Sequence, residues 1–87
     1  MLYKVKILKP ANKFLESINA KDRLRIYMVI ELLKENPFPP RVRKIKGTAN
    51  NYRVRVGDFR IVYRVLDRQL IVEVIRIGFR RDVYRNL

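Results

Sequence analysis

The fold of this chain is decided by YRVRVGDFRIVYRV, residues 52–65, in which apolar and cationic residues alternate on both sides of Gly57 and Asp58. A type II′ turn needs a positive φ at its first central position, and glycine adopts that conformation at little cost. We therefore predict two antiparallel strands joined by a two-residue loop at Gly57 and Asp58.

The alternation gives the predicted hairpin an apolar face and a basic face. The apolar face, expected to be core, holds Tyr52, Val54, Val56, Phe59, Ile61, Tyr63 and Val65. The basic face holds Arg53, Arg55, Arg60 and Arg64. Arg55 is expected directly opposite Arg60, and such like-charge pairs weaken a sheet by a few tenths to about 1 kcal/mol. A solvated face does not require the same sign at both positions, so we interpret the cluster as a polyanion site, with an ordinary exposed face as the alternative.

Composition points to one basic domain over residues 1–87. The chain has 21 Lys and Arg against 8 Asp and Glu, a net charge of +13, which suggests nucleic acid or an acidic protein as partner. It has no Cys and no His, which excludes disulfides, thiol chemistry, the usual zinc sites and imidazole acid–base catalysis, so no metal or other cofactor is expected. The N-terminal MLYKVKILKP alternates instead of forming an apolar run, so we expect neither a signal peptide nor a membrane span, and a cytoplasmic protein.

Patterning along the chain predicts an α+β domain with the order βαα-βββ. The expected elements are a strand at 3–8, a short helix from Pro10, a second helix capped by Asn19 and ended by Asn36 and Pro37, the hairpin, a strand at 70–77, and a helical turn within 80–86. Helices and strands that segregate in this way favour an antiparallel sheet with the helical hairpin on one face, followed by the short C-terminal helical turn. The basic face of the sheet would then stay open.

Two segments leave alternatives open. The basic run at residues 41–46 is either a solvated connector or a rim that contacts phosphate. In the last strand, Glu73 and Arg76 are three apart and cannot share one face of a regular strand. A two-residue loop at Asp67 and Arg68 would place Glu73 opposite Val62 on the basic face, as an ion-pair partner for arginines or, alternatively, as a catalytic base; a bulge would reverse this.

The motifs KIKGTANNYRVRVGDFRIVY (residues 44–63) and RIGFRRDVY (residues 76–84) resemble the RelE/ParE toxin superfamily, and within it the RelE-like messenger-RNA interferases. The resemblance extends over nearly the whole chain. It implies the toxin of a type II toxin–antitoxin pair, a ribosome-dependent endoribonuclease that cuts messenger RNA in the A site and so inhibits translation. It also implies a cognate antitoxin, here expected to carry an acidic amphipathic segment, and operator DNA bound only through that antitoxin.

The resemblance also assigns site residues. It implies catalytic roles for Arg53, Arg55, Arg60, Arg80 and Tyr84, and we expect Lys44, Lys46, Arg64, Arg76 and Arg81 to bind RNA. RelE itself carries lysines where this chain has Arg53 and Arg55, and many relatives have a histidine in place of Phe79. These departures leave two rivals open: a ParE-like inhibitor of DNA gyrase, and a non-catalytic RNA- or ribosome-binding module.

Overall fold

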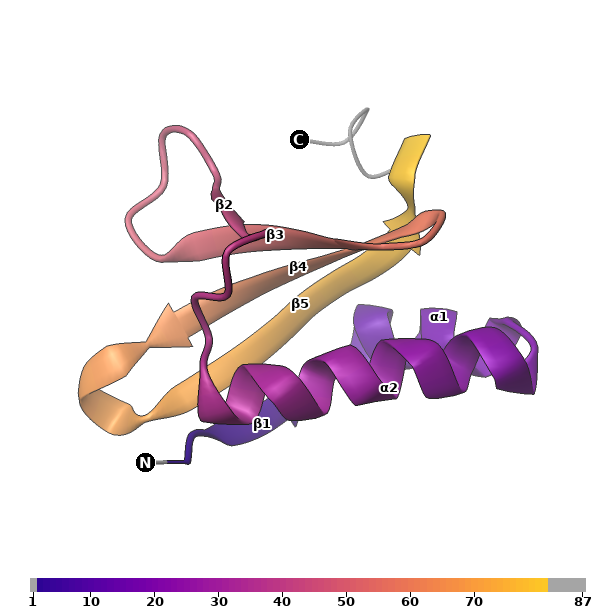
Figure 1. Cartoon of the computed structure of the whole chain (residues 1–87), viewed down its shortest axis with the longest axis horizontal. Coiled ribbons are helices and arrows are strands. Elements are labelled where there is room, and N and C mark those ends of the chain that lie inside the picture. The colour runs from indigo at the N-terminus through magenta and orange to yellow at the C-terminus, as the bar shows by residue number, and fades with distance from the viewer. Residues whose placement is uncertain (1, 82–87) are drawn as a thin grey trace.

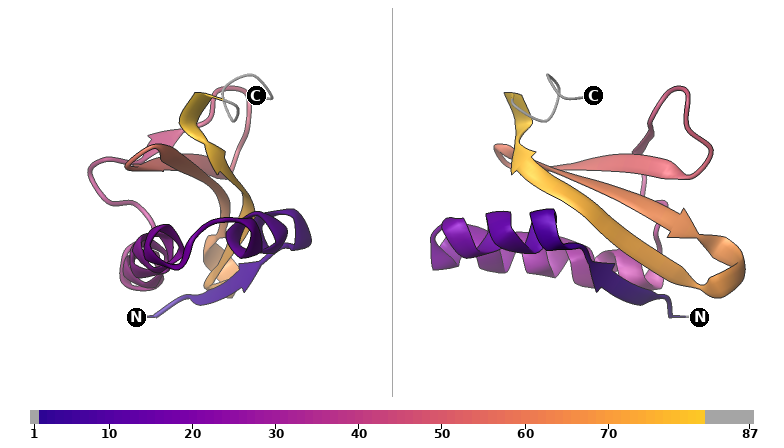
Figure 2. Two further views of the ribbon diagram at one scale, coloured as in Figure 1. Left: turned by 90° about the vertical axis from the view of Figure 1, so that its right-hand side faces the viewer. Right: turned by 180° about the vertical axis from the view of Figure 1, so that it is seen from behind.

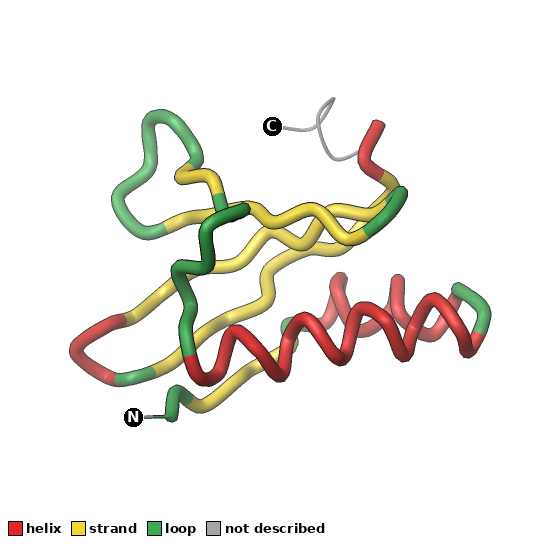
Figure 3. Tube along the Cα trace, in the orientation of Figure 1, coloured by secondary structure: helices red, strands yellow, loops and turns green. Residues whose placement is uncertain are grey.

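The computed structural model describes residues 2–81, in which two α-helices pack against one five-stranded sheet (Figure 1). The elements are β1 (Lys4–Ile7), α1 (Lys9–Ser17), α2 (Ala20–Glu35), β2 (Arg43–Lys44), β3 (Asn51–Val56), β4 (Phe59–Leu66), the 3-10 helix η1 (Asp67–Gln69) and β5 (Ile71–Phe79). The α+β class and the predicted order of helices and strands are confirmed, and the structure adds the short strand β2, which was not predicted in the basic run at residues 41–46. The connection between β2 and β3 projects from the sheet as a loop (Figure 3).

The sheet is mixed, whereas the sequence predicted a wholly antiparallel one. Its strand order is β1-β5-β4-β3-β2, and β1 runs parallel to β5. The amide of Lys4 donates to the carbonyl of Leu70 over 2.8 Å, and that of Leu8 to the carbonyl of Val74 over 2.9 Å. Alternation in residues 3–8 predicts a strand but does not identify its neighbour. Both helices follow β1 directly along the chain and cover one face of the sheet. β1 itself lies at the edge of the sheet, beside β5 (Figure 2).

The central hairpin has the predicted register. Val56 pairs with Phe59 and Arg55 with Arg60, so Gly57 and Asp58 form a two-residue loop. Gly57 has φ 58°, while Asp58 is not among the positive-φ residues, which fits a type II′ turn and excludes type I′. The predicted apolar face is buried apart from the half-buried Tyr52.

The two helices cover that apolar face and complete the core. Asn19 caps α2 as predicted, because its Oδ1 accepts from the Asp22 amide at 2.9 Å, a contact typically worth about 1 kcal/mol. Arg23 of α2 is half-buried. Its guanidinium donates to the carbonyls of Leu15 and Ile18, each over 2.8 Å, and so ties α2 to the end of α1.

Tyr63 joins the end of α2 to the central strand. Its side chain is fully buried, and its hydroxyl donates to the Pro37 carbonyl over 2.6 Å. Burial, followed by the neighbouring Tyr52, raises the pKa of Tyr63 well above its usual range, so the phenol stays protonated as a hydrogen-bond donor.

A bulge in β5 resolves the ambiguity at Glu73 and Arg76. Val62 pairs with Arg76 and Tyr63 with Val74, which leaves Ile75 as the extra residue. Both charged residues therefore lie on the basic face, and Glu73 pairs with Arg64. The predicted partner Val62 was wrong because the connection is longer than the two-residue loop expected at 67–68: β4 ends at Leu66, and η1 with the left-handed Leu70 (φ 55°) precedes β5.

At the C-terminal end, Arg80 and Arg81 begin a helical turn. The rest of the turn predicted at 80–86 lies outside the described residues. Among residues 2–81, no helix is both long enough and apolar enough to cross a membrane.

Candidate nucleic-acid interface

The sheet face opposite the helices carries the predicted basic cluster. Arg55 lies opposite Arg60, so the expected like-charge pair is present. Arg53 and Arg60 are half-buried and Arg55 is exposed. The Arg55 side chain is directed back toward the turn, since its Nε donates to the Gly57 carbonyl at 3.1 Å.

These arginines line one wall of an open cavity of about 870 Å³, which we call the guanidinium cavity. It is lined by Arg25, Pro40, Arg41, Arg43, Arg53, Arg55, Gly57 and Arg60. Among residues 2–81, every charged residue that lines this cavity is an arginine, and none is a carboxylate. Repulsion between these like charges raises the free energy of the free protein, and a bound polyanion would relieve it. Planar guanidinium groups also offer paired hydrogen-bond donors to phosphate.

Half of the arginines in this cavity were not assigned to the site from the sequence. Arg41 and Arg43 belong to the run whose role was open, and their position favours the phosphate-contacting alternative. Arg25 comes from α2, and no motif in the sequence marks it as a site residue. Its guanidinium lies against the hairpin turn, because a Cβ placed on Gly57 would be 2.9 Å from Arg25 Nη2. No sequence spacing relates α2 to a turn 32 positions further along, so only the tertiary fold identifies Arg25.

Lys44 and Lys46 extend the basic surface along the β2–β3 loop. Together with Ile45, Gly47, Thr48 and Arg53 they line a second cavity of about 530 Å³. Arg53 lines both cavities, so the two adjoin at this residue. The loop is held by Thr48, whose hydroxyl donates to the Ile45 carbonyl at 2.7 Å. A phosphate chain that occupies the guanidinium cavity can therefore continue along this loop.

Arg64 and Arg76 lie on the same sheet face but line neither of these cavities. Arg64 Nη1 is 3.2 Å from Glu73 Oε1, and Arg64 Nε donates to Asn51 Oδ1 at 3.4 Å. The expectation that Glu73 pairs with an arginine of the basic face is met. The Arg64 side chain is 44% exposed and that of Glu73 is 18% exposed, so solvent still screens the pair from one side, and its main effect is to orient Arg64.

Arg80 and Arg81 lie on the other side of the hairpin turn. They line a cavity of about 530 Å³ with Asp58 and Phe79, and the Arg80 amide donates to the Asp58 carbonyl over 2.8 Å. Gly57 lines the guanidinium cavity while Asp58 lines this one, so the two sites adjoin across the turn. Arg80 thus adjoins the hairpin turn without sharing the cavity of Arg53, Arg55 and Arg60, and Tyr84 lies outside the described residues.

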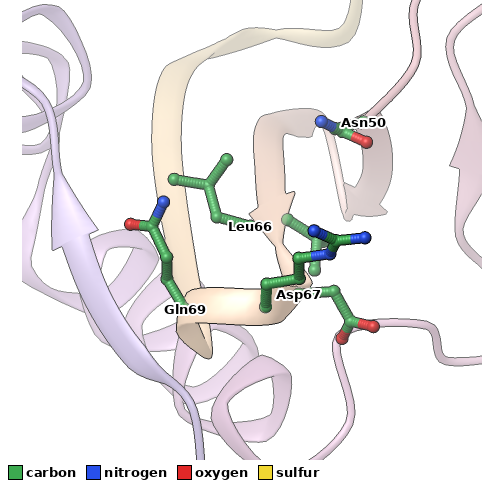
Figure 4. Close-up of a pocket in the computed structure, with 6 residues that line it drawn as sticks. Asn50, Leu66, Asp67 and Gln69 are labelled. Atoms are coloured by element: carbon green, nitrogen blue, oxygen red, sulfur yellow. The ribbon is translucent and has the colours of Figure 1, made fainter.

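A further cavity at the opposite end of the sheet does not have this chemistry. It holds about 410 Å³ and is lined by Asn50, Val65, Leu66, Asp67, Arg68 and Gln69 (Figure 4). Asp67 accepts a hydrogen bond from the Tyr3 hydroxyl, which together with burial raises the pKa of Tyr3. The carboxylate disfavours phosphate here, and we assign this end a structural role in holding η1 to the N-terminal strand.

Comparison with known proteins agrees with this basic architecture. Residues 5–84 match the family model described as the ParE toxin of type II toxin–antitoxin systems, parDE. The chain belongs to this family. It is a RelE/ParE-family toxin of a toxin–antitoxin system, as the resemblance in its two motifs predicted.

Named relatives of this toxin cover almost its full length. RelE1 of Methanocaldococcus jannaschii is 34% identical, with 99% of each chain covered, and a RelE-like toxin protein of Escherichia coli is 32% identical over 97% of this chain and 92% of its own. RelE from the archaeal RelE–RelB complex of Pyrococcus horikoshii superposes with a TM-score of 0.82 at 30% identity, covering 92% of this toxin and 97% of that chain.

Proposed function

We propose that this toxin is a ribosome-dependent, metal-independent endoribonuclease that cleaves messenger RNA in the A site and thereby inhibits translation. The observation that carries the proposal is the guanidinium cavity, whose charged lining consists of arginines from α2, the 36–42 connection, β2 and the central hairpin. An RNA backbone supplies the repeated negative charge that such a surface requires.

The proposed reaction is attack of a ribose 2′-hydroxyl on the adjacent phosphorus. The bond to the 5′-oxygen of the next nucleotide breaks, giving a 2′,3′-cyclic phosphate and a free 5′-hydroxyl. Charge builds on the non-bridging oxygens as the phosphorane forms, and Arg53, Arg55 and Arg60 would donate hydrogen bonds to them. One well-placed donor is typically worth roughly 100- to 1000-fold in rate, so three guanidiniums supply a large acceleration without a metal.

Proton transfer needs other groups. A guanidinium group carries five N–H donors and no acceptor, so Arg53 and Arg55 are poor general bases. We assign Arg80 to donate a hydrogen bond to the leaving 5′-oxygen, across the turn from the other arginines. Tyr84 is proposed to stack on a base or to orient the 2′-hydroxyl. Lys44, Lys46, Arg64, Arg76 and Arg81 are proposed to bind the flanking RNA.

The test is messenger-RNA cleavage in a reconstituted translation system, mapped by primer extension. The wild type should cut within the A-site codon, and Arg60→Ala should cut at least about 100-fold more slowly because a transition-state donor is lost. Arg80→Ala and Tyr84→Ala should also lose the cuts. Arg68→Ala is the matched control, since it removes the same charge at the remote cavity of Figure 4 and should cleave like the wild type. An intact message with the wild-type toxin would contradict the proposal.

Inhibition of DNA gyrase is the second candidate, because the family model that matches this chain describes ParE. A gyrase inhibitor acts by protein binding and has no need of a cavity lined with arginines, which is why we rank it second. If the message stays intact while growth stops, a supercoiling assay with purified gyrase distinguishes this candidate from an inactive or purely RNA-binding protein.

We also propose a cognate antitoxin with an acidic amphipathic segment, through which alone operator DNA would be bound. An apolar groove of about 370 Å³ runs beside α2, lined by Val29, Leu32, Leu33, Pro39, Pro40, Arg41, Val54 and Arg55. It shares Pro40, Arg41 and Arg55 with the guanidinium cavity. A segment with apolar and acidic residues would match both surfaces at once. The RelE of Pyrococcus horikoshii was crystallised with RelB, which supports a partner of this kind.

A further inference from the structure

Three phenylalanines meet at the hairpin tip, one each from α1, β4 and β5. The Phe59 and Phe79 ring centroids are 5.2 Å apart with a 30° tilt, and Phe14 meets Phe79 edge-on at 5.6 Å and 83°. Phe14 also meets Phe59 edge-on at 5.9 Å. Phe59 is 6% exposed, whereas Phe79 is 47% exposed. Phe79 is therefore an aromatic ring with a rigid support below it and a large surface open to solvent.

The surroundings of Phe79 suit one nucleotide of a single-stranded RNA. Phe79 shares its cavity with Arg80, Arg81 and Asp58. Sites for single-stranded nucleic acid combine an aromatic ring for the base with cations for the phosphate. The Asp58 carboxylate disfavours phosphate beside the turn but accepts N–H donors from a neutral base. The phosphate would then lie toward Arg80 and Arg81.

A single exposed aromatic residue is common on protein surfaces and carries no meaning alone. Phe38 shows the difference. It is 44% exposed and meets Tyr52 edge-on at 5.2 Å, yet it lines none of the cationic cavities described above. Phe79 combines the same exposure with two adjacent arginines and with a position across the turn from the guanidinium cavity.

We propose that Phe79 is a base-stacking residue of the RNA site: one unpaired base stacks on its exposed ring while the attached phosphate contacts Arg80 and Arg81. This inference rests on the proposed RNA function and adds a contact to it. RNA that passes the turn at Gly57 and Asp58 would contact both cavities, with phosphates on one side and a stacked base on the other.

Binding of a fluorescent single-stranded oligoribonucleotide to the full-length protein tests the inference, with 2′-O-methyl groups to prevent cleavage. A stacked base is worth about 1–3 kcal/mol, so Phe79→Leu should weaken binding roughly 5- to 150-fold, while Phe79→Trp should bind within about threefold of the wild type. Phe38→Leu is the matched control and should bind normally. Melting temperatures of all variants establish that each is folded.

Salt dependence separates stacking from charge. Phe79→Leu should weaken binding by the same factor at every salt concentration, because a neutral ring releases no counterions. Arg60→Gln should instead lower the slope of log K against log salt by about 0.7, the value per phosphate for a single strand. A 2-aminopurine base in the oligonucleotide should also lose fluorescence on binding the wild type and not on binding Phe79→Leu.

The outcomes distinguish this inference from the proposed function. If Arg60→Gln weakens binding while Phe79→Leu binds like the wild type, the stacking role is wrong and the RNA function stands. If a folded wild-type protein binds no RNA even at low salt, the stacking inference is wrong, whereas the ribosome-dependent function is decided separately by the cleavage assay. Equal losses in Phe79→Leu and Phe38→Leu would show a general effect of removing an aromatic ring and would also overturn the inference.

Discussion

At the scale of single residues, Gly57 determines both the shape of the hairpin turn and the space available to the Arg25 guanidinium. Its φ of 58° is costly for any residue with a Cβ, and that Cβ would lie 2.9 Å from Arg25 Nη2. Gly57→Ala should therefore lower the free energy of unfolding by about 1–2 kcal/mol and also displace a guanidinium from the cavity. Urea unfolding and the cleavage assay measure the two effects.

Gly47 offers a matched control for this substitution. Its φ is 81°, yet a Cβ there would have nothing within 4 Å. Gly47→Ala should lose similar stability without displacing Arg25, so it should slow cleavage less than Gly57→Ala does. In an Arg25→Ala background, Gly57→Ala should no longer affect cleavage through Arg25, as a double-mutant cycle would show. Equal cleavage rates for Gly47→Ala and Gly57→Ala would mean that the position of Arg25 does not affect cleavage.

At the scale of elements, the bulge in β5 leads to an unusual expectation. With Ile75 removed, Glu73 and Arg76 would stay on the basic face and Val74 and Ile77 in the core, because the remaining residues alternate regularly. Deleting Ile75 should therefore leave a folded protein, with reduced twist and slower cleavage. Circular dichroism and a thermal melt, together with the cleavage assay, check this.

Deletion of Ile61 from the central strand β4 is the comparison. It would move every residue on one side of the gap to the opposite face of a sheet that has one face buried, so we expect no cooperative unfolding transition. If both deletions unfold the protein, the bulge is needed for folding and the regular register is not an accessible alternative.

The elements also show how far the sequence alone reaches. The hairpin register and the cap at Asn19 follow from local rules, since each depends on residues within a few positions of one another. Arg53, Arg55 and Arg60 were found for the same reason. The parallel pairing of β1 and the position of Arg25 depend on packing between distant segments. The bulge in β5 was one of two open alternatives, because Glu73 and Arg76 signal an irregularity without locating the extra residue.

At the scale of the whole molecule, a net charge of +13 on 87 residues makes the free toxin self-repelling. An acidic partner that binds the folded state should stabilise it by about 2.7 kcal/mol at a concentration of 100 Kd. Isothermal titration with the product of the neighbouring open reading frame should show tight, salt-sensitive binding, and the melting temperature should rise. Leu32→Glu, in the apolar groove, should weaken that binding with RNA cleavage intact. Absence of tight binding would contradict the proposed antitoxin.

The short β2 has a consequence for the protein before any partner binds. β2 pairs with Tyr52 and Arg53, and the remainder of that edge of β3 extends past its end. Edges of this kind recruit strands from other copies and lead to aggregation. Here Arg41, Arg43 and Arg55 lie along the edge, so a second copy would bring the same charges against them. The arginines proposed to hold RNA would thus also keep newly made toxin molecules apart.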